Sequence, residues 1–230
     1  MTSPLRIGFL LFPRLTQLDF TGPFEVLGRL PGAEVRTLWK QAGPVRSDTG
    51  LVILADTALA DCPQLDLVCV PGGPGVAALM EDEEVLAFLR RQAAGARWVT
   101  SVCTGALVLG AAGLLRGRRA TTHWASHDFL AVLGAIPVQA RVVRDGNLLT
   151  GGGVTAGIDF ALTIAAEIAG EAAAQAIQLG IEYAPAPPFA AGHPSIAPAA
   201  VLEAARDRGA GMRAEREALV ARVAARLAAA

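Results

Sequence analysis

The sequence predicts an α/β fold, in which a doubly wound, mostly parallel sheet is sandwiched between helices. Short apolar runs of strand length alternate with longer segments of helical period, and glycine and proline stand at the joints. The chain has 230 residues, of which 53% are hydrophobic, and this is ample for a sizeable core. Together these observations favour helices on both faces of a parallel sheet.

The first hundred residues supply four predicted strands and two predicted helices. The strands are expected at 6–12, 34–39, 51–54 and 65–70, with 51–54 as an auxiliary strand. One helix is expected to open at Thr21-Gly22-Pro23, because proline suits a first helical turn, with Phe24, Leu27 and Leu30 on its inner face. The other is expected over 82–94.

The second half continues the alternation. A buried strand at 97–102 gives way to a helix beginning near Thr104, and a short strand at 120–123 leads to a helix over 125–133. Segments 140–144 and 147–150 straddle Asp145-Gly146, which is a hairpin signal. Further helices are expected over 155–168 and 171–183.

The C-terminal part differs in composition. Residues 185–198 are rich in proline and alanine and predict an extended strap. A helix follows over 199–230, with Leu219, Val223 and Leu227 on one face and Arg216, Arg222 and Arg226 outside them. We therefore expect an α/β domain over 1–198 and a helical extension over 199–230 that packs on the domain or on a partner subunit.

The charge pattern excludes several classes of partner. The formal net charge is −1, and basic and acidic residues are interspersed, so we expect binding of neither nucleic acid nor an anionic membrane. Three cysteines without metal-ligand spacing, and no secretory signal, predict a cytoplasmic protein without a metal site. Neither a Walker motif nor GxGxxG occurs, so no nucleotide is inferred. Small molecules are the expected partners.

Cys103 is the leading candidate for chemistry, because it stands where a buried strand turns into a helix. The first helical amides have no backbone partners and the helix dipole is positive there, so we expect the pKa of this thiol to lie below about 8.5. Such an elbow suits a nucleophile. The alternative is a small buried hydrophobe, which is how we interpret Cys62 and Cys69.

Other candidates gather at the carboxyl ends of the predicted strands, where open parallel sheets bind ligands. Asp19 either caps the helix near Gly22 or serves as a general acid beside the thiol. Thr104 could cap its helix or direct its hydroxyl and amide at a substrate, and these two roles are compatible. The glycines of Pro71-Gly72-Gly73 leave backbone amides unobstructed. His123 either approaches the cysteine or is a core histidine whose ring is hydrogen-bonded within the fold.

These segments resemble the isonitrile hydratases, a branch of the ThiJ/PfpI superfamily with a flavodoxin-like, class I glutamine amidotransferase-like fold. The resemblance runs nearly end to end, and position 19 holds aspartate where many relatives of the superfamily carry glutamate. The segments that carry it include Leu18-Asp19-Phe20-Thr21-Gly22-Pro23, Pro71-Gly72-Gly73, Ser101-Val102-Cys103-Thr104-Gly105, Thr121-Thr122-His123-Trp124, Gly151-Gly152-Gly153 and the strap Glu182-Tyr183-Ala184-Pro185-Ala186-Pro187-Pro188-Phe189.

The resemblance implies hydration of organic isonitriles to N-substituted formamides by a homodimer that needs no cofactor. It implies Cys103 as nucleophile, with Asp19 and Thr104 as its catalytic partners. Gly72, Gly73, Gly152 and Val154 are the expected substrate-binding residues. Two other functions stay open: a glyoxalase or deglycase acting on reactive aldehydes through the same thiol, and a non-catalytic redox or ligand sensor. No helix-turn-helix module is recognisable after the sheet domain, which disfavours a DNA-binding regulator.

Overall fold

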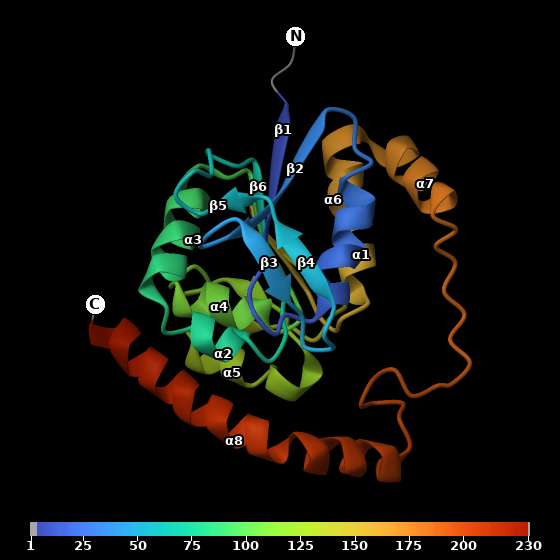
Figure 1. Cartoon of the computed structure of the whole chain (residues 1–230). Coiled ribbons are helices and arrows are strands. Elements are labelled where there is room, and N and C mark those ends of the chain that lie inside the picture. Colours follow the sequence, from blue (N-terminus) through green and yellow to red (C-terminus); the bar gives the residue numbers. More distant parts are fainter. Residues whose placement is uncertain (1–3, 230) are drawn as a thin grey trace.

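The computed structural model describes residues 4–229 and contains a central seven-stranded sheet (Figure 1). Its strand order is β10-β11-β7-β6-β1-β2-β5, and the only antiparallel pair of this sheet within 4–229 is β10 with β11. The strands are β1 (Leu5–Leu10), β2 (Ala33–Trp39), β5 (Thr57–Ala58), β6 (Leu67–Val70), β7 (Trp98–Val102), β10 (Val142–Asp145) and β11 (Leu148–Gly151). The predicted α/β fold is confirmed.

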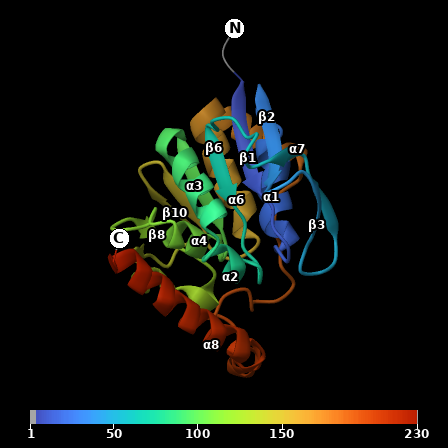
Figure 2. The same cartoon turned by 60° about the vertical axis from the view of Figure 1, so that its left-hand side comes forward.

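Helices cover both faces of the sheet (Figures 1 and 2). One face carries α1 (Gln17–Leu27), α6 (Ala156–Ala169) and α7 (Glu171–Gly180). The other carries α2 (Val76–Leu79), α3 (Glu83–Gly95), α4 (Gly105–Ala111) and α5 (Phe129–Val132). Small two-stranded sheets are formed by β3 (Gly43–Arg46) with β4 (Val52–Ala55) and by β8 (Arg119–Ala120) with β9 (Ile136–Pro137).

Two helix predictions were wrong. Helix α1 begins at Gln17, after extended Thr16, and Pro23 lies in its interior. An interior proline removes one N–H and its ring crowds the carbonyl four residues earlier, but the buried Phe20, Val26 and Leu27 hold the helix on the sheet despite that cost. Segment 125–133 is not one helix, because a 3₁₀ turn η1 (Trp124–Ser126) precedes the short α5.

The parallel register brings the ends of the central strands to one edge. Val70 pairs with Ser101 and Gly151 with Val102, so β6, β7 and β11 end side by side. The central strands β6, β7 and β11 are buried along their whole length, as expected for a sheet covered on both faces. The loops that follow these strands are therefore held against a rigid core.

The C-terminal helix α8 (Ala199–Ala229) crosses the end of the molecule opposite the N-terminus (Figures 1 and 2). It packs on α4, α5 and η1 of the same chain through the buried Leu219, Val220 and Val223. Arg216 was expected on the outer face but is buried, with 9% of its surface exposed. Residues 185–198 form neither helix nor strand, and no helix within 4–229 has the length and apolar character to cross a membrane.

Candidate active site

Cys103 lies at a strained elbow between β7 and α4. Its φ is +55°, a left-handed conformation that non-glycine residues rarely adopt. Two hydrogen bonds hold it there: its amide donates to the Gly151 carbonyl at 3.0 Å, and the Thr122 hydroxyl donates to its carbonyl at 2.7 Å. Position 105 requires glycine, because a Cβ there would lie 2.0 Å from the Val70 carbonyl oxygen. This geometry is typical of a presented nucleophile.

Asp19 is fully buried in the first turn of α1 and faces the elbow. Its Oδ2 accepts the backbone N–H of Gly72 at 2.8 Å, whereas its Oδ1 has no hydrogen-bond partner within residues 4–229. The interpretation of Asp19 as a helix cap was therefore wrong, because Thr16 stands at the N-cap and the carboxyl binds the glycine turn instead. An unpartnered buried oxygen beside a thiol suits proton transfer.

Burial dominates the ionisation of both groups. It raises the pKa of Asp19 to about 7, although the Gly72 amide and Cys103 act to lower it and Asp48 adds to the rise. Burial also raises the pKa of Cys103 well above its ordinary value, and the charge of Asp19 raises it further. The expectation of a lowered thiol pKa was therefore wrong: Thr104 does lower it, but the sulfur is too buried for this to prevail.

Thr104 joins the elbow to the glycine turn. Its hydroxyl oxygen accepts the Gly73 amide at 3.0 Å and makes no helix cap, so the capping interpretation was wrong. Gly72 has no room for a side chain, since a Cβ there would lie 2.6 Å from the Thr104 nitrogen and 2.7 Å from Asp19 Oδ2. The amides of both glycines are thus engaged by catalytic candidates and do not point free into the site.

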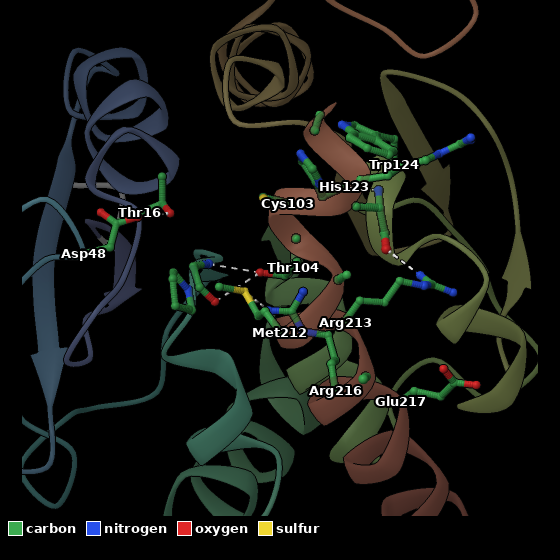
Figure 3. Close-up of a pocket in the computed structure, with 18 of the residues that line it drawn as sticks. Thr16, Asp48, Cys103, Thr104, His123, Trp124, Met212, Arg213, Arg216 and Glu217 are labelled. Atoms are coloured by element: carbon green, nitrogen blue, oxygen red, sulfur yellow. Dashed lines mark hydrogen bonds between the residues drawn. The ribbon is translucent and has the colours of Figure 1, made fainter. Parts of the chain in front are cut away.

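A cavity of about 920 Å³ opens at the elbow (Figure 3). The predicted site residues Cys103, Thr104, Gly73 and Val154 line it. Gly72, Gly152 and Asp19 are not among the lining residues: Asp19 and Gly72 lie behind the elbow, and the Gly152 amide donates to the Arg141 carbonyl. The structure thus brings the catalytic candidates together. Of the predicted glycines, Gly73 lines the cavity, whereas Gly72 and Gly152 lie behind its surface.

His123 and Trp124 also line the cavity. His123 Nδ1 accepts the Ala125 amide at 3.3 Å, and burial together with the charge of Arg216 lowers the pKa of the imidazole. His123 therefore stands in the site as a neutral ring that is already hydrogen-bonded. Cys62 and Cys69 lie away from the cavity, and burial raises the pKa of their thiols to about 11 and about 12.

Helix α8 forms the second wall, which sequence reasoning did not foresee. Figure 3 shows Met212 and Arg216 projecting from α8 toward Thr104, whereas Arg213 extends to the other side, where it bonds to Ala125 and Asp128. The apolar period of the helix predicted its packing, and it also held a signal for Arg216, which lies three and seven positions before Leu219 and Val223 and therefore shares their buried face. Within residues 4–229, no cluster of three His, Cys, Asp or Glu side chains is placed to hold a metal ion.

Comparisons with known proteins bear on both the sheet domain and helix α8. The chain matches the DJ-1/PfpI family over residues 5–167, which ends before α8. It is 61% identical to the isonitrile hydratase of Pseudomonas putida over 97% of this chain and 98% of that protein. A ThiJ/PfpI family protein from Pseudomonas syringae superposes with a TM-score of 0.92 at 44% identity, covering 94% of this chain and 90% of the other. Drosophila melanogaster DJ-1beta gives 0.72 at 30% identity, covering 79% of this chain and 100% of its own.

Proposed function

The chain belongs to the DJ-1/PfpI family, and within that family we propose that it hydrates organic isonitriles to N-substituted formamides. The observation that carries the proposal is the 61% identity to an isonitrile hydratase, which extends over 97% of the chain and so includes most of α8. The cavity with Cys103 and the adjoining Asp19 supply the chemistry that this reaction requires.

The first step is the addition of the Cys103 thiol to the terminal isonitrile carbon. When Cys103 and Asp19 together hold a single proton, we place it on the sulfur and the negative charge on Asp19. Burial raises the pKa of the thiol well above its ordinary value, whereas it raises that of Asp19 only to about 7. As sulfur bonds to carbon, Asp19 takes the thiol proton and passes it to the same carbon. The product is a thioimidate, S–CH=N–R, which contains every atom of the thiol and the isonitrile.

The second step is hydrolysis of this thioimidate. A water molecule adds its oxygen to the carbon, and Asp19 carries one water proton to the nitrogen. The carbon–sulfur bond then breaks as the carbonyl forms, and the remaining hydroxyl proton returns through Asp19 to the sulfur. The formamide leaves, and the thiol is restored without net gain or loss of protons or electrons.

The remaining candidates position these groups. Thr104 connects the elbow to Gly73, and Gly72 fixes the carboxyl of Asp19, so both act on the geometry of the reacting pair. Val154 and Trp124 offer apolar surface to the organic group of the substrate. We propose that residues 1–198 form the catalytic domain and that 199–230 close one side of its cavity. No step calls for a cofactor.

We further propose that the chain acts as a homodimer in the cytoplasm. Leu51, Val52 and Leu54 in and beside the β3–β4 ribbon are about half exposed or more, at 51%, 49% and 65%, which suits contact with a second subunit. The three unpaired cysteines agree with a reducing compartment. Light scattering on the purified protein tests the dimer.

Product analysis tests the proposed reaction. The purified protein is incubated with tert-butyl isonitrile and, separately, with methylglyoxal, and the products are identified by mass spectrometry. Formation of N-tert-butylformamide by the wild type, but not by Cys103→Ala, is expected. Conversion of methylglyoxal alone would assign the thiol to aldehyde chemistry instead.

A further inference from the structure

We propose that Arg216 binds an anionic group, a carboxylate, at the α8 wall of the cavity, so that the preferred isonitriles carry a carboxylate away from the reacting carbon. This inference rests on the proposed function, since it names the class of substrate for that same site. It concerns a part of the chain that lies beyond the residues matched by the family, 5–167.

Arg216 is a buried cation without an anionic partner. Its side chain extends from α8 into the cavity (Figure 3) and is 9% exposed. Its nitrogens donate to Ser126 Oγ at 3.1 Å and to the Met212 sulfur at 3.6 Å, and its Nε has no partner within residues 4–229. A guanidinium has five N–H donors, so several remain available to a ligand.

Neighbouring arginines of the same helix are neutralised. Arg213 pairs with Asp128 at 2.6 Å, and Arg222 pairs with Glu81 at 3.1 Å. The side chains of Arg213 and Arg222 are 43% and 60% exposed, so water can solvate their charges even without an ion pair. Arg216 is the one of the three that is buried, and yet it has only neutral contacts. Burial of an uncompensated charge is costly, so a retained one points to a ligand that supplies the opposite charge.

The groups that face Arg216 do not supply that charge. Burial lowers the pKa of the guanidinium, an effect that an anionic Cys103 partly offsets. Cys103 is neutral, however, as long as its sulfur holds the proton that it shares with Asp19. His123 is neutral as well, and the carboxylates that line the cavity, Asp48, Asp207 and Glu217, make no ion pair with Arg216.

The cavity has room for such a substrate. Its volume of about 920 Å³ lies near the upper end of the range of about 300–1,000 Å³ usual for small-molecule sites, whereas a simple alkyl isonitrile fills only a fraction of it. A carboxylate suits Arg216 because the planar guanidinium donates two parallel hydrogen bonds to its two oxygens. A flexible chain can then join this anchor on α8 to the isonitrile carbon at Cys103.

Specificity ratios test the proposal in the whole protein. The values of kcat/KM are measured for 6-isocyanohexanoate and for neutral pentyl isonitrile with the wild type, Arg216→Met and Arg222→Met. The second variant is the matched control, since it removes an arginine from α8 that lies outside the cavity. We expect the wild type to prefer the carboxylate by about tenfold or more, Arg216→Met to lose at least about tenfold of that ratio, and Arg222→Met to keep it.

Two results would overturn the proposal: no preference for the carboxylate in the wild type, or an equal loss on both substrates in Arg216→Met. A binding measurement separates it from the proposed reaction. Calorimetry on Cys103→Ala with hexanoate and with hexanamide requires no turnover and is expected to give tighter binding of hexanoate, abolished by a second substitution, Arg216→Met. Equal affinities for the two probes would refute the anion site even if isonitriles are hydrated, and tighter hexanoate binding would support it even if they are not.

Discussion

Asp19 Oδ2 and the backbone N–H of Gly72 are joined by a hydrogen bond of 2.8 Å that spans 53 positions of the sequence. It fixes the carboxyl from α1 beneath the elbow that follows β7. Because Gly72 lies against both this carboxyl and Thr104, the absence of a side chain at position 72 is a requirement of the site.

Gly72→Ala is therefore expected to lower kcat/KM by at least about tenfold, since a Cβ 2.7 Å from Asp19 Oδ2 must displace the carboxyl. Gly153→Ala is the matched control, because a Cβ at position 153 meets nothing within 4 Å. Steady-state kinetics on both variants check the expectation. Equal activities would show that the packing around position 72 does not constrain Asp19.

Asp19 gives the stability of the protein a pH dependence of definite sign. Its pKa is raised from 3.8 to about 7 on folding, so between these values the folded chain holds a proton that the unfolded chain has lost. Its contribution to the free energy of unfolding is therefore fully present below pH 4 and is lost as the pH rises through 7, by an amount on the order of 4 kcal/mol.

Asp19→Asn removes this titration and keeps an acceptor for the Gly72 amide. Urea unfolding of both proteins from pH 4 to pH 8 is expected to show the variant gaining stability relative to the wild type as the pH rises. A difference that stays constant across this range would mean that Asp19 is ionised throughout. The same substitution is expected to abolish most formamide production, because it removes the proton carrier.

The positive φ of Cys103 predicts an unusual order of stability. Cys103→Ala keeps the left-handed strain, whereas Cys103→Gly relieves it, so the glycine variant should be the more stable by about 1 kcal/mol. Ala111→Gly within α4 should show the opposite sign, since glycine is costly in a helix. Thermal unfolding measures all three, and a less stable Cys103→Gly than Cys103→Ala would argue against strain at the elbow.

Thr104 supports the glycine turn through its hydroxyl. Thr104→Val leaves the buried Gly73 amide without its acceptor and is expected to cost about 1–3 kcal/mol, whereas Thr104→Ser keeps the oxygen and should cost less. Denaturant titrations of the two variants compare them directly. If Thr104→Val unfolded with the same free energy as Thr104→Ser, the hydrogen bond to Gly73 would not contribute to the stability of the fold.

The sheet and the elbow could be predicted from the sequence, because apolar runs of strand length and the small residues around Cys103 report local structure. The start of α1 could not, since Pro23 is a strong signal for a first turn and only the packing of Phe20 and Val26 on the sheet overrides it. The 3₁₀ turn at Trp124–Ser126 also depends on contacts distant in the sequence, among them those with α8.

The ionisation of the site was beyond sequence reasoning for a related reason. A helix N-terminus lowers a thiol pKa, and that contribution is visible in the sequence, but burial opposes it and depends on the tertiary structure. Arg216 is a different case, because its spacing of three and seven positions from Leu219 and Val223 places it on their face of the helix, and the expected outer position overlooked this. Its partner could not be predicted, since only the docking of α8 over η1 brings the guanidinium to Ser126.

Intact-protein mass spectrometry of a rapidly quenched reaction tests the covalent role of Cys103 most directly. With tert-butyl isonitrile, a covalent thioimidate on Cys103 predicts a transient mass increase equal to one substrate molecule, located by digestion on the peptide that contains Cys103 and missing from Cys103→Ala. Steady production of formamide by Cys103→Ala, with no adduct on the wild type at any quench time, would contradict it.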